Sequence, residues 1–138
     1  MLYITGIYAL NLTCKLNTFG DWHQSALNWK KMDVRDSVDS PFLDYGIEEN
    51  NFVPEHPGCH YVANHIRALL DMLYAGQFSL AQGMRDDFIG VDEYNEEVFE
   101  KVYRLHQLPQ WQDINNFMKC EYKLLWIRFL ERIKIKNE

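Results

Sequence analysis

Apolar and polar residues alternate along the first part of the chain. The even positions of residues 2–16 carry apolar or small side chains, and the odd positions from residue 11 onward carry polar ones. Because successive residues of a β-strand point to opposite faces of its sheet, this period of two predicts a half-buried strand over residues 2–16. The alternation is cleanest from Leu10 to Leu16, and Gly6 is the expected place for a bulge or a bend.

A turn over residues 17–21 is expected to follow this strand, because Asn, Thr, Gly and Asp gather there. The pattern of residues 21–29 is ambiguous. Asp21 and Gln24 have the spacing of a capping box, which favours a short helix. A strand or an ordered loop fits the same residues almost as well, so the three alternatives stay open.

Residues 33–55 combine acidic side chains with scattered Pro, Asn and Ser, which is typical of irregular surface structure. A short strand is expected only at Phe42–Ile47. A connection of this length without regular structure is usually functional or disordered. This segment therefore becomes the first place to look for a function.

Beyond Gly58 the apolar period changes to that of a helix. One helix is expected from about Val62 to Leu73, with Gly76 as its stop. A second is expected to begin at a capping box of Ser79 and Gln82. A third should begin at Asp92, and a last one should run from Gln110 to Ile135 with a length of about 39 Å at 1.5 Å per residue. The apolar positions expected at the buried faces of these helices are Val62, Ile66, Leu69, Leu70, Leu73, Ala81, Met84, Phe88, Tyr94, Val98, Phe99, Val102, Leu105, Trp111, Ile114, Met118, Leu125, Phe129 and Ile133.

These elements predict one α+β domain over residues 1–138, in which helices cover one face of a small sheet. Apolar residues make up 47% of the chain, which excludes wholesale disorder. No window approaches the roughly 20 apolar residues that cross a bilayer. Three widely spaced cysteines without a CxxC pair favour free thiols, and the N-terminus lacks a signal-peptide pattern. We therefore expect a cytoplasmic protein with no membrane contact.

The net charge of the chain is concentrated in residues 33–55. This stretch holds seven acids and one base, so its charge of −6 equals that of the whole protein. A local acidic surface attracts basic partners and repels nucleic acid. A second acidic stretch, residues 86–100, has no base, whereas residues 119–136 carry a net charge of +4. The basic stretch is typical of cations that complement the dipole at the C-terminus of a helix. The alternative is a contact with an acidic partner or with a second copy, which includes a homodimer through the C-terminal helix.

Two histidine-containing groups are candidates for chemistry. Asp21 and His23, two residues apart, have the types needed for an oriented general base, with His65 as a further member if folding brings it near. His56, Cys59, His60 and His65 offer zinc-ligand types, although their spacing matches no standard zinc pattern. We expect no cofactor as the main interpretation, and zinc is the alternative.

Other catalytic patterns are missing from the sequence. The chain has no GxSxG nucleophile motif, no phosphate-binding P-loop and no GxGxxG. Cys14 is expected on the apolar face of the first strand and Cys120 in the last helix, where thiols are usually inert packing.

Five short segments give the chain a resemblance to other proteins. They are YITG at 3–6, ALN at 9–11, GDWH at 20–23, DYGIE at 44–48 and ANHIRALLD at 63–71. Together they resemble a family of small, uncharacterised bacterial proteins. That family has no established activity or cofactor, so the resemblance implies no residue role. Small bacterial proteins of this kind are often partners of toxins, phage-defence components or mobile elements.

These observations predict a small acidic interaction module that binds a basic protein and regulates or neutralises it, as antitoxins, immunity proteins and phage inhibitors do. The rings within the acidic stretch would supply affinity, and the charges would set on-rate and specificity. The residues expected to contact the partner are Asp36, Asp39, Phe42, Asp44, Tyr45, Glu48, Glu49 and Phe52. The alternative is a small metal-assisted hydrolase that uses the histidines.

Overall fold

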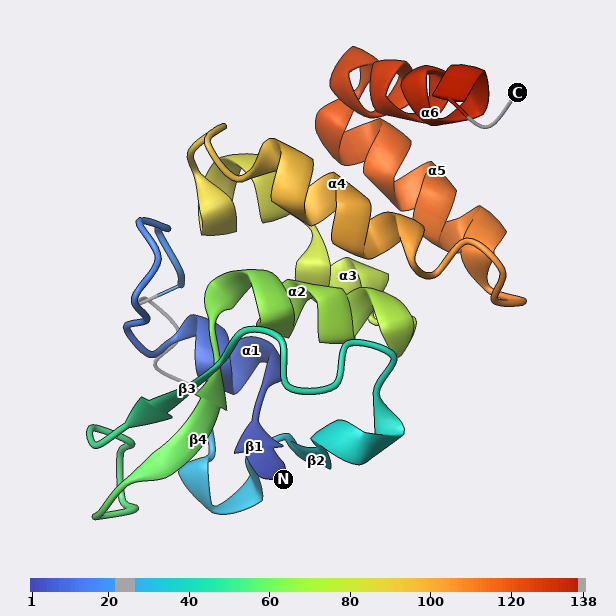
Figure 1. The fold of residues 1–138 in the computed structure, drawn as a ribbon. Helices are drawn as coiled ribbons and strands as arrows, with labels where there is room; N and C mark the ends of the chain where they lie inside the picture. The colour runs from blue at the N-terminus through green and yellow to red at the C-terminus, as the bar shows by residue number, and fades with distance from the viewer. Residues whose placement is uncertain (22–26, 137–138) are drawn as a thin grey trace.

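A computed structural model describes residues 1–21 and 27–136, and it confirms the α+β fold. The sheet has four strands in the order β2-β1-β4-β3. They are β1 (Leu2–Ile4), β2 (Val34–Asp36), β3 (Ile47–Asn50) and β4 (His60–Ala63). The two outer pairs are antiparallel and the central pair, β1 and β4, is parallel. Figure 1 shows this sheet at one end of the molecule, with the C-terminal helices at the other.

The predicted strand over residues 2–16 is wrong beyond Ile4. Gly6 has a φ of 66°, which turns the chain out of the strand and starts helix α1 (Gly6–Leu10). The buried residues of α1 are Gly6, Ala9 and Leu10, whose spacing is helical. Ala9 stands at an odd position, so the even-position pattern missed this face. Residues 11–16 follow as irregular chain.

The strand expected at Phe42–Ile47 is also wrong, because β3 begins where that strand was to end. Leu43 and Gly46 have φ values of 49° and 71°, which no strand accommodates. Phe42 lies in the turn before β3. Two short 3₁₀ helices, Trp29–Lys31 and Ser37–Asp39, flank β2. The capping box of Asp21 and Gln24 is not tested, since residues 22–26 lie outside the described residues.

Helix α2 (His65–Tyr74) is the centre of the fold, and nine of its ten residues are buried. Figure 1 shows α2 between the sheet and the C-terminal helices. Asn64 caps it, because its side-chain oxygen accepts a hydrogen bond of 2.8 Å from the backbone N–H of Arg67. Gly76, at a φ of 75°, follows its end as predicted. Val62 belongs to β4 and not to this helix, which corrects the predicted start.

The remaining helices pack above α2. They are α3 (Phe78–Ala81), a π-helix (Met84–Ile89), α4 (Asn95–Tyr103), α5 (Trp111–Tyr122) and α6 (Leu124–Lys136). No helix begins at a side-chain cap from Ser79 or Asp92, so those two predictions are wrong. Within the described residues, no helix is long and apolar enough to cross a membrane.

The single helix expected from Gln110 to Ile135 is two helices. Lys123 breaks it with a φ of 54° and a ψ of −126°. The break folds α6 back so that Trp126 and Phe129 become buried beside Phe99 of α4. One continuous helix of this length would have carried α6 away from that core.

Candidate functional site

The acidic segment 33–55 does not form one continuous charged surface. Asp33 pairs with Arg35 at 2.8 Å, and Asp36 pairs with the N-terminal ammonium at 2.9 Å. Asp36 also accepts a hydrogen bond from the backbone N–H of Val38, and its pKa is lowered first by the N-terminal ammonium and then by this contact. Asp36 and Asp39 lie by β2, which is the opposite edge of the sheet from β3.

Two of the expected aromatic contact residues are held by the protein itself. Phe42 is only 2% exposed, and the guanidinium carbon of Arg67 lies 5.6 Å from its ring centroid, so the prediction of Phe42 as a surface anchor is wrong. The hydroxyl of Tyr45 donates to Glu97, and Lys101 Nζ lies 4.2 Å above its ring. Burial, followed by Glu97, raises the pKa of Tyr45. Tyr45 therefore joins the sheet region to α4.

Three other carboxylates of the segment, those of Asp44, Glu48 and Glu49, lie at or near β3. A hollow of about 330 Å³ is lined by Met1, Lys15, Asp44, Ile47, Glu48, Glu49 and Tyr61. We call it the acidic hollow. Asp44 and Glu49 are exposed, and Glu48 accepts a hydrogen bond of 3.0 Å from the backbone N–H of Lys15. Within residues 1–21 and 27–136, none of these three carboxylates forms an ion pair.

One aromatic side chain, Tyr61, lines the acidic hollow, and a second, Phe52, lies in the loop that follows β3. Phe52 is 84% exposed in the loop just after β3. Tyr61 is 44% exposed and lies opposite Glu49 in the β3–β4 pair. Large exposed rings beside charge are typical of protein contact surfaces. The hollow thus offers a partner both carboxylates and apolar area.

The three histidines of the zinc alternative, all of them among the described residues, do not assemble into one site. His56 Nε2 lies 2.7 Å from the carbonyl oxygen of Trp29, and His60 Nε2 lies 3.1 Å from that of His56. Their rings are 6.2 Å apart, and Cys59 beside them is exposed. His65 has different partners. Across the described ranges, no three His, Cys, Asp or Glu side chains are grouped so that they could hold a metal ion.

The proposed general base of the Asp21–His23 pair cannot be placed, because His23 lies outside the described residues. The backbone N–H of Asp21 donates to the carbonyl of Leu10 at 2.8 Å, which ties this segment to the end of α1. The metal-assisted hydrolase therefore gains no support from the geometry.

A cluster of Cys14, Thr18 and His65 was not anticipated. Thr18 Oγ1 lies 2.6 Å from His65 Nδ1 and 3.6 Å from Cys14 Sγ, so the hydroxyl stands between thiol and imidazole. His65 Nε2 lies 2.7 Å from the carbonyl oxygen of Leu12, to which it must donate. A cavity of about 130 Å³ adjoins the cluster and is lined by Leu10, Asn11, Leu12, Thr13, Cys14, Thr18, Phe19 and His65.

Cys14 and His65 shift each other's protonation towards a charged pair. Burial raises the pKa of Cys14, but its contacts with His65 and Thr18 outweigh burial and lower it. Burial likewise lowers the pKa of His65, while Cys14, the Leu12 carbonyl and Glu48 raise it overall. A thiolate beside an imidazolium is the reactive form of a cysteine.

Local backbone features position this cluster. His65 is the first residue of α2, directly after the cap Asn64. Gly20 packs against its ring at a φ of 67°, and a Cβ there would lie 2.6 Å from His65 Cε1. A sequence signal existed in the four-residue spacing of Cys14 and Thr18, but nothing in it pointed to residue 65.

Three of the segments that carry the family resemblance, at 3–6, 44–48 and 63–71, are joined at α2. Asp71 accepts hydrogen bonds of 2.7 Å from the hydroxyls of Tyr3 and Thr5, and it pairs with Arg67 at 3.0 Å. The backbone N–H of Asn64 donates to the carbonyl of Gly46 at 2.6 Å. Arg67 and Asp71 are fully buried, so this network holds the sheet to the helix and offers no access to a substrate.

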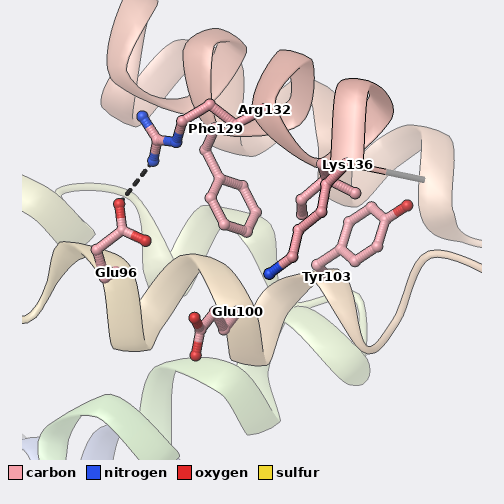
Figure 2. Close-up of a pocket in the computed structure, with 7 residues that line it drawn as sticks. Glu96, Glu100, Tyr103, Phe129, Arg132 and Lys136 are labelled. Carbon is pink, nitrogen blue, oxygen red and sulfur yellow. Dashed lines mark hydrogen bonds and ion pairs between the residues drawn. The ribbon is translucent and has the colours of Figure 1, made fainter. Parts of the chain in front are cut away.

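A further groove of about 410 Å³ lies between α4 and α6. Figure 2 shows Glu96 and Glu100 of α4 together with Arg132 and Lys136 of α6. Arg132 pairs with Glu96 at 2.6 Å, with both side chains more than half exposed. Because two acids face two bases, this groove has no excess charge that would select a partner.

No family model matches the chain, and no curated protein or solved structure does so either. The resemblance to small bacterial proteins stays a prediction. The function is therefore inferred from the geometry of the described residues.

Proposed function

We propose that the protein is an interaction module that binds a basic segment of a partner protein at the acidic hollow, and so regulates or neutralises that partner. The observation that carries the proposal is the grouping of Asp44, Glu48 and Glu49 around one hollow. Lys15 also lines the hollow and leaves it with a net negative charge. The acids near β2 are instead paired or lie at the other edge of the sheet.

Charge and apolar area have separate parts in this docking. Carboxylates on an exposed rim speed the encounter with a basic partner and select against acidic ones, but each exposed ion pair adds about 0.2–1 kcal/mol at most. The exposed ring of Phe52 offers the larger contribution to affinity, because aromatic residues dominate the binding energy of protein interfaces. Binding should therefore weaken both with salt and on loss of the ring.

The test is affinity capture from the native host with three tagged proteins. The first is the unaltered protein. The second carries Asp44→Lys, Glu49→Lys and Phe52→Ala, all at exposed positions. We expect the unaltered protein to retain one basic protein in stoichiometric amount at low salt and to retain less of it near 1 M salt, where the Debye length is about 3 Å. The triple variant should retain none.

The third protein is a matched control with the same change in charge elsewhere. It carries Glu100→Lys, Glu131→Lys and Leu124→Ala, which are also exposed positions and lie on α4 and α6. It should retain the partner as the unaltered protein does, and circular dichroism should show all three folded. Capture of the same proteins by both variants would contradict docking at the acidic hollow.

A further inference from the structure

The thiol of Cys14 differs from the other two cysteines of the chain in its surroundings. Cys59 and Cys120 are exposed, whereas Cys14 is half-buried on the wall of the 130 Å³ cavity. Thr18 and His65 lie beside it in the arrangement Sγ–Oγ1–Nδ1, with steps of 3.6 Å and 2.6 Å. A thiol, a hydroxyl and an imidazole in sequence form a path for a proton.

From this geometry we propose that Cys14 is a site of S-thiolation, at which its thiolate attacks a small disulfide and forms a mixed disulfide. The site is separate from the acidic hollow, so the proposal does not depend on partner docking. Its substrate class is the disulfide of a low-mass thiol.

The proton leaves Cys14 through Thr18. The thiol proton passes to Thr18 Oγ1 while the hydroxyl proton of Thr18 passes to His65 Nδ1, so Thr18 ends unchanged. His65 can hold the second proton because its Nε2–H already donates to the carbonyl of Leu12. The carboxylate of Glu48 adds a favourable charge effect on the imidazolium. The result is a thiolate next to an imidazolium.

In the thiol–disulfide exchange, the small disulfide is the oxidant. The thiolate of Cys14 attacks one sulfur of RS–SR, the new Cys14 S–S bond forms, and the RS–SR bond breaks. The leaving thiolate takes the proton from His65 and departs as RSH. Cys14 is oxidised and the small disulfide is reduced, so no further oxidant is needed.

The cavity sets the size of the group that is transferred. A volume of about 130 Å³ corresponds to roughly four waters at 30 Å³ each. Leu10, Leu12 and Phe19 give it apolar walls, and Asn11 and Thr13 add polar ones. A short group such as hydroxyethylthio fits this space, whereas a bulky peptide thiol would extend beyond it.

The test uses two full-length proteins that each keep one cysteine for comparison. Cys59→Ser with Cys120→Ser keeps Cys14, and Cys14→Ser with Cys120→Ser keeps the exposed Cys59. Both react with 2-hydroxyethyl disulfide, a small neutral probe, from about pH 6 to pH 10, and intact-mass spectrometry follows the mixed disulfide. The ratio of the Cys14 rate to the Cys59 rate is the measured quantity.

We expect this ratio to rise as the pH falls, because the thiolate fraction of a thiol drops about tenfold for each pH unit below its pKa. Differences in access and in intrinsic nucleophilicity cancel when the ratios at two pH values are compared. A ratio that is reproducibly greater near pH 6 than near pH 10 supports the site. A ratio that does not change with pH overturns it.

Two further variants of the Cys14-only protein test the proton path. Thr18→Val removes the hydroxyl while it keeps the shape of a half-buried side chain, and His65→Gln removes the base. His65→Gln should lose most of the rise of the ratio at low pH, and Thr18→Val should reduce it by less, because the contacts with His65 lower the pKa of Cys14 more than the contact with Thr18 does. Because His65 is buried, His65→Gln counts only if its circular dichroism matches the parent. A folded His65→Gln variant with an unchanged pH dependence overturns the role of His65, and a Thr18→Val variant whose ratio falls by more than that of His65→Gln overturns the order of the two contacts.

Discussion

The buried ion pair of Arg67 and Asp71 gives the sharpest test of how the fold is held together. Replacing Asp71 by Asn keeps the size of the side chain and removes its charge. Asp71 Oδ1 accepts from Arg67 Nε at 3.0 Å, and Oδ2 accepts from the hydroxyls of Tyr3 and Thr5 at 2.7 Å each. An amide presents N–H donors on one of these two sides, so one set of donors loses its acceptor.

The cost follows from the burial of the partner that remains. Arg67 is 0% exposed, so its guanidinium cannot regain water when the carboxylate is lost. Its guanidinium also donates to the carbonyls of Leu43 and Tyr45 at 2.6 Å each and to the hydroxyl of Tyr3 at 2.9 Å, and these acceptors supply partial charges but no full counter-charge. Removing one member of a buried ion pair usually costs about 3–5 kcal/mol. We expect Asp71→Asn to lower the free energy of unfolding by that amount.

Urea unfolding followed by circular dichroism measures this free energy, provided that the m-value does not change. Glu96→Gln is the matched control, because it removes a carboxylate from an exposed ion pair with Arg132 and should cost less than about 1 kcal/mol. The double variant Arg67→Met with Asp71→Asn should cost less than the sum of the two single changes, since the uncompensated charge is gone. Equal losses for Asp71→Asn and Glu96→Gln would refute the reasoning.

Three more predictions test individual features. Lys123→Gly should stabilise the protein by about 1 kcal/mol in urea unfolding, because its φ of 54° and ψ of −126° strain any residue with a side chain, and destabilisation would contradict this. Phe42→Ala should cost about 3–5 kcal/mol, whereas Phe52→Ala should stay within about 0.5 kcal/mol in the same assay, because only Phe42 is buried; similar losses would contradict that burial. Cys14→Ser should lower the pKa of His65 in an NMR titration, because Cys14 raises this pKa in the fold. An unchanged pKa would contradict an interaction between Cys14 and His65. A histidine whose pKa is raised in the fold stabilises the fold at a pH below its unfolded-state pKa. This contribution is lost as the pH rises through the folded-state pKa. The Cys14→Ser variant should therefore lose less stability than the unaltered protein over this pH range.

The sequence predicted the helices well where the spacing of buried apolar residues alone determines the secondary structure. The apolar positions of α2 and α4 lie at helical spacing, and Ile66, Leu69 and Val98 are all fully buried. The prediction failed where single backbone torsions redirect the chain. A positive φ at Gly6 ended the first strand, and another at Lys123 divided the last helix. Lysine has no sequence preference that would reveal such a break.

The candidate surface was predicted in its composition but not in its geometry. Charge counting found the acidic stretch, but it could not show that Asp33 and Asp36 have cationic partners close by. The sequence also could not show that Phe42 is buried whereas Phe52 is exposed, because both are phenylalanines in the same segment. Phe42 is buried by contacts with residues far along the chain. The thiol cluster depends on Cys14 and His65, which lie 51 positions apart. No local pattern links residues at that separation.

The acidic hollow and the thiol cavity share one short stretch of chain. Lys15 lines the hollow and Cys14 lines the cavity. On one side of Cys14 the carbonyl of Thr13 accepts from Asn50 Nδ2 at 3.3 Å, and on the other the N–H of Lys15 donates to Glu48. Both contacts reach β3, so a group added to Cys14 and a partner bound at β3 act on the same backbone. Their effects are therefore separable only when binding is measured with Cys14 reduced and with Cys14 thiolated.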